Sequence, residues 1–392
     1  MKIAILAERM LPGSIPKVTS AEARYLVKLG HDVEIVTIME GGLHSDSYQF
    51  QEFLDGIKIR ELSREFRMAK LLDFKLPFFA FLSGYHVLGP VLASHIIKNR
   101  EYDLIIALNT VTALTAYQVY KRRNIPYVNY HWDPFSYIFT KVYASKLPGL
   151  VSSPLFRITS WFDRLIVENS VITISLSEDH ATFLRSLTRK RDIEVVYLGC
   201  FPVEHLKEKR GDYLLAIDRW DRGNMPHILL DVLAKLEKKI PLIVAGFCSE
   251  KWIEESFLQL RDQKGLTSYV KWLGPVSETE LEELYSHARA WLHPIEESSL
   301  SMPALEAAAH GCPIVMPRGT PLFRNEVNSF FPAEGDVEQY AQYVDRLVGD
   351  ERLAWSMGCE AWKVAKQNSW ESHAEQLCRI LNERAQLPIY SK

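Results

Sequence analysis

The sequence predicts an α/β protein built from two successive domains, each with a mainly parallel sheet, and three observations support this fold class. Short apolar runs of strand length alternate with helical segments along most of the chain. A charged interruption at about residues 200 to 210 divides this alternation into two sets. Residues 289 to 320 then show one repeating unit clearly, as a strand, a loop, a helix and a second strand. We therefore expect two Rossmann-like, doubly wound domains that face each other across a cleft.

The first domain is expected to span residues 1–200. Its strands are expected at residues 2–7, 33–38, 56–62, 103–108, 127–130, 171–175 and 193–198. Helices are expected from about Ser20 to Gly30, at 112–121, at 153–169 and from residue 177. The first two strands and the helix between them form a βαβ unit. Its turn has no GxGxxG pattern, so no dinucleotide-binding fingerprint is present.

The second domain is expected to span residues 201–370, followed by a helix and tail at 371–392. Strands are expected at 213–217, 241–245, 270–273, 290–292 and 313–316, with a helix at 251–263. Ser277 and Glu280 have the spacing of a capping box, which predicts a helix that ends near residue 289. The next helix has Pro303 in its first turn, and Gly311 ends it.

The loop before Pro303 is the first candidate for a binding site. It follows a strand and meets the positive end of a helix, which is where an open parallel sheet binds anionic ligands. The residues expected around such a ligand are Ser299, Leu300, Ser301 and Met302. Glu306 has two interpretations: a carboxylate that caps the helix or interacts with its dipole, or one that accepts two hydrogen bonds from a vicinal diol such as a ribose.

The stretch around Glu306 resembles the signature of the GT-B nucleotide-sugar glycosyltransferases of the large retaining family 4. In that family two Glu residues, with seven residues between them, flank the sugar donor, and Glu306 matches the second of them. Ser298 stands where the first is expected, and Glu297 is one residue too far. Either the loop bulges by one residue, which would make Glu297 the catalytic carboxylate beside the donor sugar, or that carboxylate is altered.

The loop at 218–224 (DRWDRGN) resembles the segment from which this family supplies an Arg and a Lys to the donor diphosphate. Negative charge develops on the leaving phosphate, so fixed cations there stabilise the transition state more than the ground state. Arg219 matches the Arg. Asn224 stands at the Lys position, and Arg222 is the expected substitute. Apart from the resemblance, the same loop reads as a solvated surface turn.

The first half resembles the same family in the string LVKLGHDVEIVT and in the loop before it, where Gly13 and Ser14 stand at the family's glycine pair. The resemblance implies that the backbone there approaches the donor phosphate and the acceptor. It also implies that His131 contacts the donor sugar, with Asp133 as a second candidate; a structural His at the end of a strand is the alternative. Val276 is expected near the nucleotide base.

Composition narrows the classes of function. The 392 residues are 47% hydrophobic, enough for two cores, and the net charge of −3 argues against a nucleic-acid-binding protein. The five cysteines are scattered without a CxxC pair, which indicates neither a disulfide framework nor a zinc site and favours a reducing cytoplasm. The start of the chain does not read as a signal peptide.

One segment, residues 60–81, interleaves basic residues with aromatic and aliphatic ones. It is either an ordinary helix with a solvated basic face or a peripheral contact with anionic lipids at the inner face of the membrane.

The residues alone indicate a nucleotide or phosphate ligand. The family resemblance implies more, namely a retaining, metal-independent hexosyltransferase that uses a nucleotide-diphosphate sugar as donor and needs no further cofactor. The expected acceptor is a glycan or a lipid-linked molecule in cell-surface polysaccharide or glycolipid synthesis. By resemblance, the last helix packs back on the first domain. Three alternatives stay open: a noncatalytic subunit that binds the nucleotide sugar, an epimerase, and a phosphorylase, although no pyridoxal-binding lysine was identified.

Overall fold

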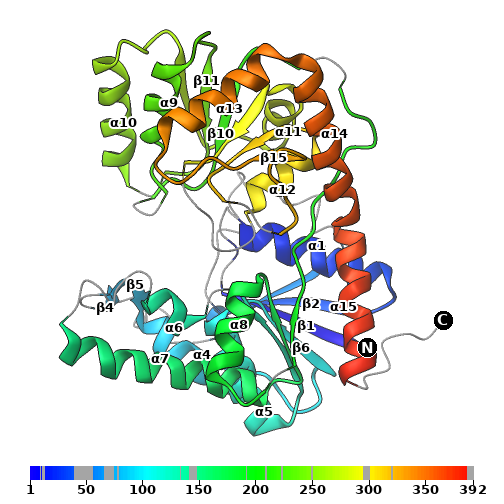
Figure 1. Cartoon of the computed structure of the whole chain (residues 1–392). Coiled ribbons are helices and arrows are strands. Elements are labelled where there is room, and N and C mark those ends of the chain that lie inside the picture. The colour runs from blue at the N-terminus through cyan, green and yellow to red at the C-terminus, as the bar shows by residue number, and fades with distance from the viewer. Residues whose placement is uncertain are drawn as a thin grey trace. The chain divides into compact units, whose positions relative to one another are not determined.

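The computed structural model describes residues 1–8, 10, 14–38, 56–65, 75–76, 79–132, 134–140, 148–190, 192–207, 210–221, 224–248, 250–294, 301–318 and 321–385. The chain forms two compact units, Met1–Tyr197 with His373–Lys392, and Leu198–Ser372 (Figure 1). The chain thus leaves the first unit at Tyr197 and returns to it with its last helix.

The first unit is organised around a parallel sheet with the strand order β3-β2-β1-β6-β7-β8-β9. These strands are β1 (Lys2–Ala7), β2 (Asp32–Thr37), β3 (Lys58–Glu61), β6 (Leu104–Ala107), β7 (Tyr127–His131), β8 (Ile172–Ser175) and β9 (Ile193–Val195). A separate antiparallel pair is formed by β4 (Lys75–Leu76) and β5 (Phe79–Ser83). The order reverses between β1 and β6, as in a doubly wound sheet.

Helices cover both faces of this sheet. They are α1 (Ser14–Lys28), α3 (Leu62–Glu65), α4 (Gly84–Ile96), α5 (Thr110–Arg123), α6 (Phe135–Ile138), α7 (Gly149–Asn169), α8 (Glu178–Leu187) and α15 (Trp370–Ala385). Alternate residues of a strand point to opposite faces. Ile3 and Ile5 accordingly share a core with Leu26 of α1 and Leu377 of α15, whereas Leu6 joins another core with α4 and α5.

The second unit contains a parallel sheet with the order β12-β11-β10-β13-β14-β15. Its strands are β10 (Leu214–Ile217), β11 (Leu242–Ala245), β12 (Val270–Gly274), β13 (Ala290–Leu292), β14 (Ile314–Val315) and β15 (Ser329–Phe330). Its helices are α9 (Ile228–Lys235), α10 (Lys251–Gln263), α11 (Glu278–His287), α12 (Met302–Ala309), α13 (Val337–Gly349) and α14 (Glu351–Gln367).

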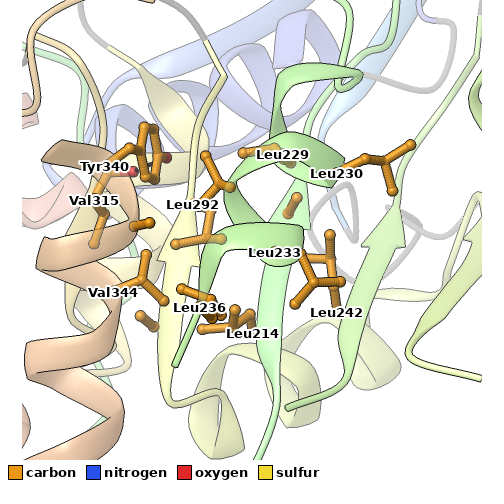
Figure 2. Close-up of a cluster of buried hydrophobic side chains, with 14 of the residues drawn as sticks. Leu214, Leu229, Leu230, Leu233, Leu236, Leu242, Leu292, Val315, Tyr340 and Val344 are labelled. Carbon is orange, nitrogen blue, oxygen red and sulfur yellow. Dashed lines mark hydrogen bonds between the residues drawn. The ribbon is translucent and has the colours of Figure 1, made fainter. Parts of the chain in front are cut away.

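A single apolar cluster holds this sheet to α9, α10, α13 and α14. Leu214 and Leu242 from the strands meet Leu229 and Leu233 of α9, and Val344 of α13, which contacts α9, joins the same cluster (Figure 2). These side chains are almost completely buried, so each contributes roughly 1.5–3 kcal/mol of transfer free energy. The core fixes β10, β11 and β13 side by side and so determines where the loops at their carboxyl ends meet.

The α/β prediction is confirmed, and several local predictions can be compared with the structure. Ser277 and Glu280 form the predicted capping box of α11. Gly311 follows α12 with a φ of +64°, a conformation that a glycine adopts without strain. The predicted start of α1 near Ser20 was wrong, because the helix begins at Ser14. Pro16 lies in its first turn, where a backbone N–H has no partner in the helix, so the proline does not delay the start.

Among the described helices, none combines the length and the apolar character needed to cross a membrane.

Candidate nucleotide-sugar site

The candidate site lies at the carboxyl edge of the second sheet. All the strand pairs of this sheet are parallel, so every strand ends at the same edge. The strand order reverses between β10 and β13, which makes their ends the switch point of the sheet. Open α/β sheets bind ligands in the crevice at such a point. Asp218 and Arg219 follow β10, and His293 follows β13.

Asp218 and His293 are joined across the switch point. His293 Nε2 lies 2.9 Å from Asp218 Oδ2, and the His293 side chain is completely buried. The backbone N–H of His293 donates to the Tyr340 hydroxyl at 3.0 Å, and that hydroxyl lies 2.8 Å from the His293 carbonyl oxygen. The other carboxylate oxygen of Asp218 accepts from the Arg219 backbone N–H at 2.6 Å. The start of the loop after β10 is therefore held in one position.

The next loop along the sheet approaches Asp218 so closely that it requires a glycine. A Cβ atom at Gly246 would lie 1.9 Å from the Asp218 carbonyl oxygen, and Gly246 has a φ of +113°. Both the conformation and the contact exclude a side chain. Trp220 is fully buried and donates its indole N–H to the Ala245 carbonyl oxygen at 2.8 Å. The loops after β10 and β11 are thus packed against each other.

Arg219 presents its charge to solvent from this fixed loop. Its side chain is 73% exposed, and Nη2 lies 3.0 Å from Asp221 Oδ2. The Asn224 side-chain amide donates to the Arg219 carbonyl oxygen at 3.3 Å, so Asn224 supports the loop but supplies no cation. An exposed ion pair of this kind contributes little to stability. The guanidinium can therefore exchange Asp221 for a ligand phosphate with only a small loss of folding free energy.

Glu306 lies on the same side of the unit, in contact with a buried tyrosine. The Tyr285 hydroxyl of α11 donates to Glu306 Oε2 at 3.3 Å. Burial is the main reason that the pKa of Tyr285 lies well above its usual range, and the negative charges of Glu306 and Asp218 raise it further. Both carboxylates therefore lie within electrostatic reach of one hydroxyl. We expected Glu306 in the first turn of its helix. The helix begins at Met302, so Glu306 is its fifth residue and lies just beyond that turn.

The amino end of α12 is capped. The Ser301 side chain is buried and accepts from the Ala304 backbone N–H at 3.4 Å. Pro303 occupies the first turn, as predicted. Met302 is half-buried at the first position of the helix.

In the first unit, His131 ends β7 with its side chain completely buried. Its Nε2 lies 3.2 Å from Asp163 Oδ1 of α7. The Asp163 carboxylate also accepts from the backbone N–H groups of Phe135 at 3.0 Å and Ser136 at 2.8 Å. Asp163 therefore links the end of β7 to the start of α6. No residue of the described part of the chain hydrogen-bonds His131 Nδ1.

Two family models match the chain. The model described as Glycosyltransferase Family 4 matches residues 17–200, and the model described as Glycosyl transferases group 1 matches residues 212–350. The chain belongs to glycosyltransferase family 4. The two models divide the chain at 200–212, close to the boundary between the two structural units at Tyr197 and Leu198.

Curated relatives of this family 4 chain match only part of it. A D-inositol 3-phosphate glycosyltransferase of Corynebacterium urealyticum is 28% identical over 182 residues, which are 44% of this chain and 43% of the relative. The O-antigen chain mannosyltransferase B of Escherichia coli is 26% identical over 139 residues, 35% of this chain and 36% of the relative. The aligned segments span about two fifths of the length of these relatives.

Solved structures match the whole family 4 fold. Anabaena Alr3699/HepE, solved with UDP and glucose, has a TM-score of 0.74 at 15% identity, covering 98% of this chain and 100% of that one. Sucrose-phosphate synthase of Thermosynechococcus elongatus has a TM-score of 0.75 at 15% identity, covering 97% and 98%. These likenesses establish the GT-B fold.

Several predicted site residues of this family 4 chain lie outside the described residues. They are Gly13, Asp133, Arg222, Glu297, Ser298, Ser299 and Leu300. A bulged loop with Glu297 and an altered carboxylate both stay predictions. Ser14 is the first residue of α1, and Val276 is half-buried after β12.

The structure brings Arg219 and Glu306 to the side of the second unit that also holds three residues missed by the sequence analysis, Asp218, His293 and Tyr285. His293 follows the strand Ala290–Leu292 directly. The rule that singled out His131, a histidine at the carboxyl end of a strand, applies equally to His293 and was not applied there. Tyr285 has no such signal, because its contact with Glu306 depends on how α11 packs against α12.

Proposed function

We propose that this chain transfers a hexose from a nucleotide-diphosphate sugar to a glycan or a lipid-linked acceptor, with retention of configuration at the sugar carbon and without a metal ion. The observation that carries the proposal is the grouping of Arg219, Asp218 and Glu306 around the switch point of the second sheet. A guanidinium and a carboxylate at one sheet edge suit the diphosphate and the ribose diol of one ligand.

Each group has a role in the proposed reaction. Arg219 stabilises the negative charge that develops on the leaving diphosphate, and the amino end of α12 adds its dipole. Glu306 accepts hydrogen bonds from the two ribose hydroxyls. The acceptor enters on the face of the leaving group, and the departing diphosphate takes the acceptor proton, so no carboxylate nucleophile is required. In this scheme His131 contacts the donor sugar and Val276 lies near the base.

The test is the release of nucleoside diphosphate from a panel of nucleotide sugars, with and without candidate acceptors. We expect release that depends on one donor and rises when the acceptor is added. Nuclear magnetic resonance of the product would show the same anomeric configuration as the donor, and EDTA would leave the rate unchanged. Inversion at the sugar carbon or a loss of activity in EDTA would contradict the corresponding part of the proposal.

A second candidate function is a noncatalytic subunit that binds the nucleotide sugar. It is favoured by the loop after β10, where Arg219 is paired with Asp221 and Asn224 replaces the family's lysine. A site with less positive charge binds a diphosphate without stabilising its departure. Tight donor binding, without release of nucleoside diphosphate for any acceptor, would favour this function over the transferase.

The predicted membrane contact at residues 60–81 stays a prediction, since half of that segment lies outside the described residues. Its described part carries less free charge than the sequence suggested. Arg60 pairs with Glu65 at 2.7 Å and with Glu101 at 2.6 Å, and Arg64 pairs with Glu61.

A further inference from the structure

Helix α7 of the first unit departs in part from the pattern of an ordinary surface helix: Ile166 and Val167 are buried near its end, but the residues before them show the opposite pattern. Ser160 and Asp163 face inward and are 2% and 0% exposed. Leu150 is 91% exposed, Ile158 51% and Trp161 53%. Surface helices of globular proteins bury their apolar side and expose their polar side. Helix α7 is the long helix at the lower left of Figure 1. Its inward side combines the polar pair with Ile166 and Val167, whereas its exposed side carries a row of apolar residues.

The exposed apolar residues form one continuous row. Residues three or four apart lie on the same side of a helix. The row consists of the exposed Leu150, Pro154, Ile158 and Trp161 and ends at Leu165, which is half-buried; the exposed Val151 lies beside it. Its inward side is occupied, because Asp163 accepts hydrogen bonds from α6 and from His131, so the helix cannot rotate to bury the row. An exposed apolar surface that the fold holds outward marks a contact site.

The charges beside the row select the kind of partner. Arg157 and Arg164 are seven residues apart and lie along one border of the row, both exposed. The acidic residues of α7 are Asp163, which is buried, and Glu168, which lies in the last turn. Arginines beside an apolar stripe with an outward tryptophan are the features of a helix that lies in a membrane interface.

A second helix on the same face of the sheet also exposes apolar side chains. Leu88 and Val91 of α4 are 47% and 37% exposed. Both α4 and α7 contact α5, so they cover the same face of the first sheet.

We propose that the first unit docks on an anionic lipid bilayer through the exposed face of α7, defined by Leu150, Pro154, Ile158, Trp161 and Leu165 with Arg157 and Arg164 at its border. The helix lies in the plane of the interface, its apolar row enters the headgroup region, and the two guanidinium groups meet lipid phosphates. The residues of this face are not part of the segment 60–81. Docking does not depend on the proposed sugar transfer, because the binding measurement involves neither donor nor acceptor.

The test is co-sedimentation of the full chain with vesicles of phosphatidylcholine alone and of phosphatidylcholine with 30% phosphatidylglycerol. We expect binding to the anionic vesicles that weakens as salt rises. The double variant I158E/W161E should weaken it at least tenfold. The variant R157Q/R164Q should weaken it several-fold on anionic vesicles only.

Matched controls use exposed residues of the second unit. Trp252→Glu changes a tryptophan that is 41% exposed on α10, and K238Q/K239Q removes the same charge as the arginine variant. Both controls should bind vesicles like the unaltered protein. Circular dichroism should be unchanged in every variant, because the substituted side chains are exposed.

Vesicle binding that is equal in I158E/W161E and the unaltered chain would overturn the proposal, as would the absence of any binding to anionic vesicles. Light scattering supplies a further outcome. A dimer that becomes a monomer in I158E/W161E, without vesicle binding, would assign the face to self-association and also overturn the proposal.

Discussion

Glu306 and Tyr285 form the contact at the candidate site that links two helices. Tyr285 is completely buried on α11, and its hydroxyl reaches Glu306 of α12 at 3.3 Å. The ring of His310 stacks on Tyr285 with 5.6 Å between the centroids. Each carboxylate oxygen has two lone pairs, so Glu306 can accept hydrogen bonds in addition to the long one from this hydroxyl. This capacity is what a ribose diol requires.

Glu306→Gln should weaken donor binding without unfolding the second unit. The amide has the shape of the carboxylate but loses the charge, and a hydrogen bond to a charged group contributes about 1.5–3 kcal/mol. We expect a dissociation constant for the nucleotide sugar that rises roughly 10- to 100-fold in calorimetric titration. Glu282→Gln, an exposed carboxylate on α11, is the control. Equal affinity in both variants would remove Glu306 from the binding site.

Arg219→Ala should affect turnover more than donor binding. The guanidinium meets charge that develops as the sugar bond breaks, so its loss lowers kcat roughly 100-fold and changes the donor KM much less. The kcat of Arg219→Lys should lie between those of the unaltered protein and of Arg219→Ala, because lysine keeps the positive charge but loses the two-pronged hydrogen bonding of the guanidinium. Asp221→Asn releases the guanidinium from its partner and should preserve turnover. A rise in KM with unchanged kcat would assign Arg219 to ground-state binding.

How much of the site could be predicted differs from residue to residue. Arg219 and Glu306 were found because short motifs carry them. His293 was available to the rule used for His131 and was passed over. Tyr285 could not be predicted, because its contact with Glu306, 21 positions away, depends on helix packing and not on local spacing.

The elements of the second unit set the site through their loops. β10 and β11 end side by side, and the turn at Gly246 passes over the carbonyl group of Asp218. The sequence predicted both strands, because each is a short apolar run with a turn signal after it. The close approach of the two loops was not predictable, since it depends on the register and twist of the sheet. Similarly, the true start of α1 at Ser14 was missed because Pro16 was read as part of a loop.

Gly246→Ala should disturb the site by displacing the loop after β10. The added Cβ would meet the Asp218 carbonyl oxygen, and the positive φ is strained for alanine. We expect a loss of about 2 kcal/mol or more in stability and a fall in donor turnover. Gly265→Ala is the matched control, since Gly265 has a φ of +66° but no atom within 4 Å of the added Cβ. It should lose stability only. Similar turnover in both variants would mean that the packing of these loops is not needed for the reaction.

At the scale of the whole molecule, the first unit is completed only by the end of the chain. Its core includes Leu377 and Leu381 of α15, which pack with Ile3 and Ile5 of β1. Contacts between such distant parts of the sequence form late and slowly in folding. The end of α15 that enters the unit also carries His373, which is buried beside Tyr130 of β7, with 3.4 Å between His373 Nε2 and the Tyr130 hydroxyl.

Glu22 of α1 and His373 give the attachment of α15 two opposed dependences on pH. Burial raises the pKa of Glu22 to about 7, and the Tyr130 hydroxyl offsets this only in part. Between pH 4.5 and 7 the folded state therefore binds more protons at Glu22 than the unfolded state, and stability falls as pH rises. Burial lowers the pKa of His373 to about 4. Between pH 6.5 and 4 the unfolded state binds more protons there, so stability falls as pH falls. The two effects oppose each other over most of this range.

Single variants should reveal each dependence. Glu22→Gln leaves only His373, so the free energy of opening α15 should rise by about 3 kcal/mol from pH 4 to pH 7. His373→Gln leaves only Glu22, so the same quantity should fall by a similar amount from pH 4.5 to pH 7.5. Hydrogen exchange of α15 amides, corrected for the intrinsic effect of pH, measures both, and Glu383→Gln at an exposed position of α15 is the control. In the unaltered chain the profile should be nearly flat between these limits, because the two groups cancel. Parallel profiles in all the proteins would mean that neither group changes its protonation when α15 detaches.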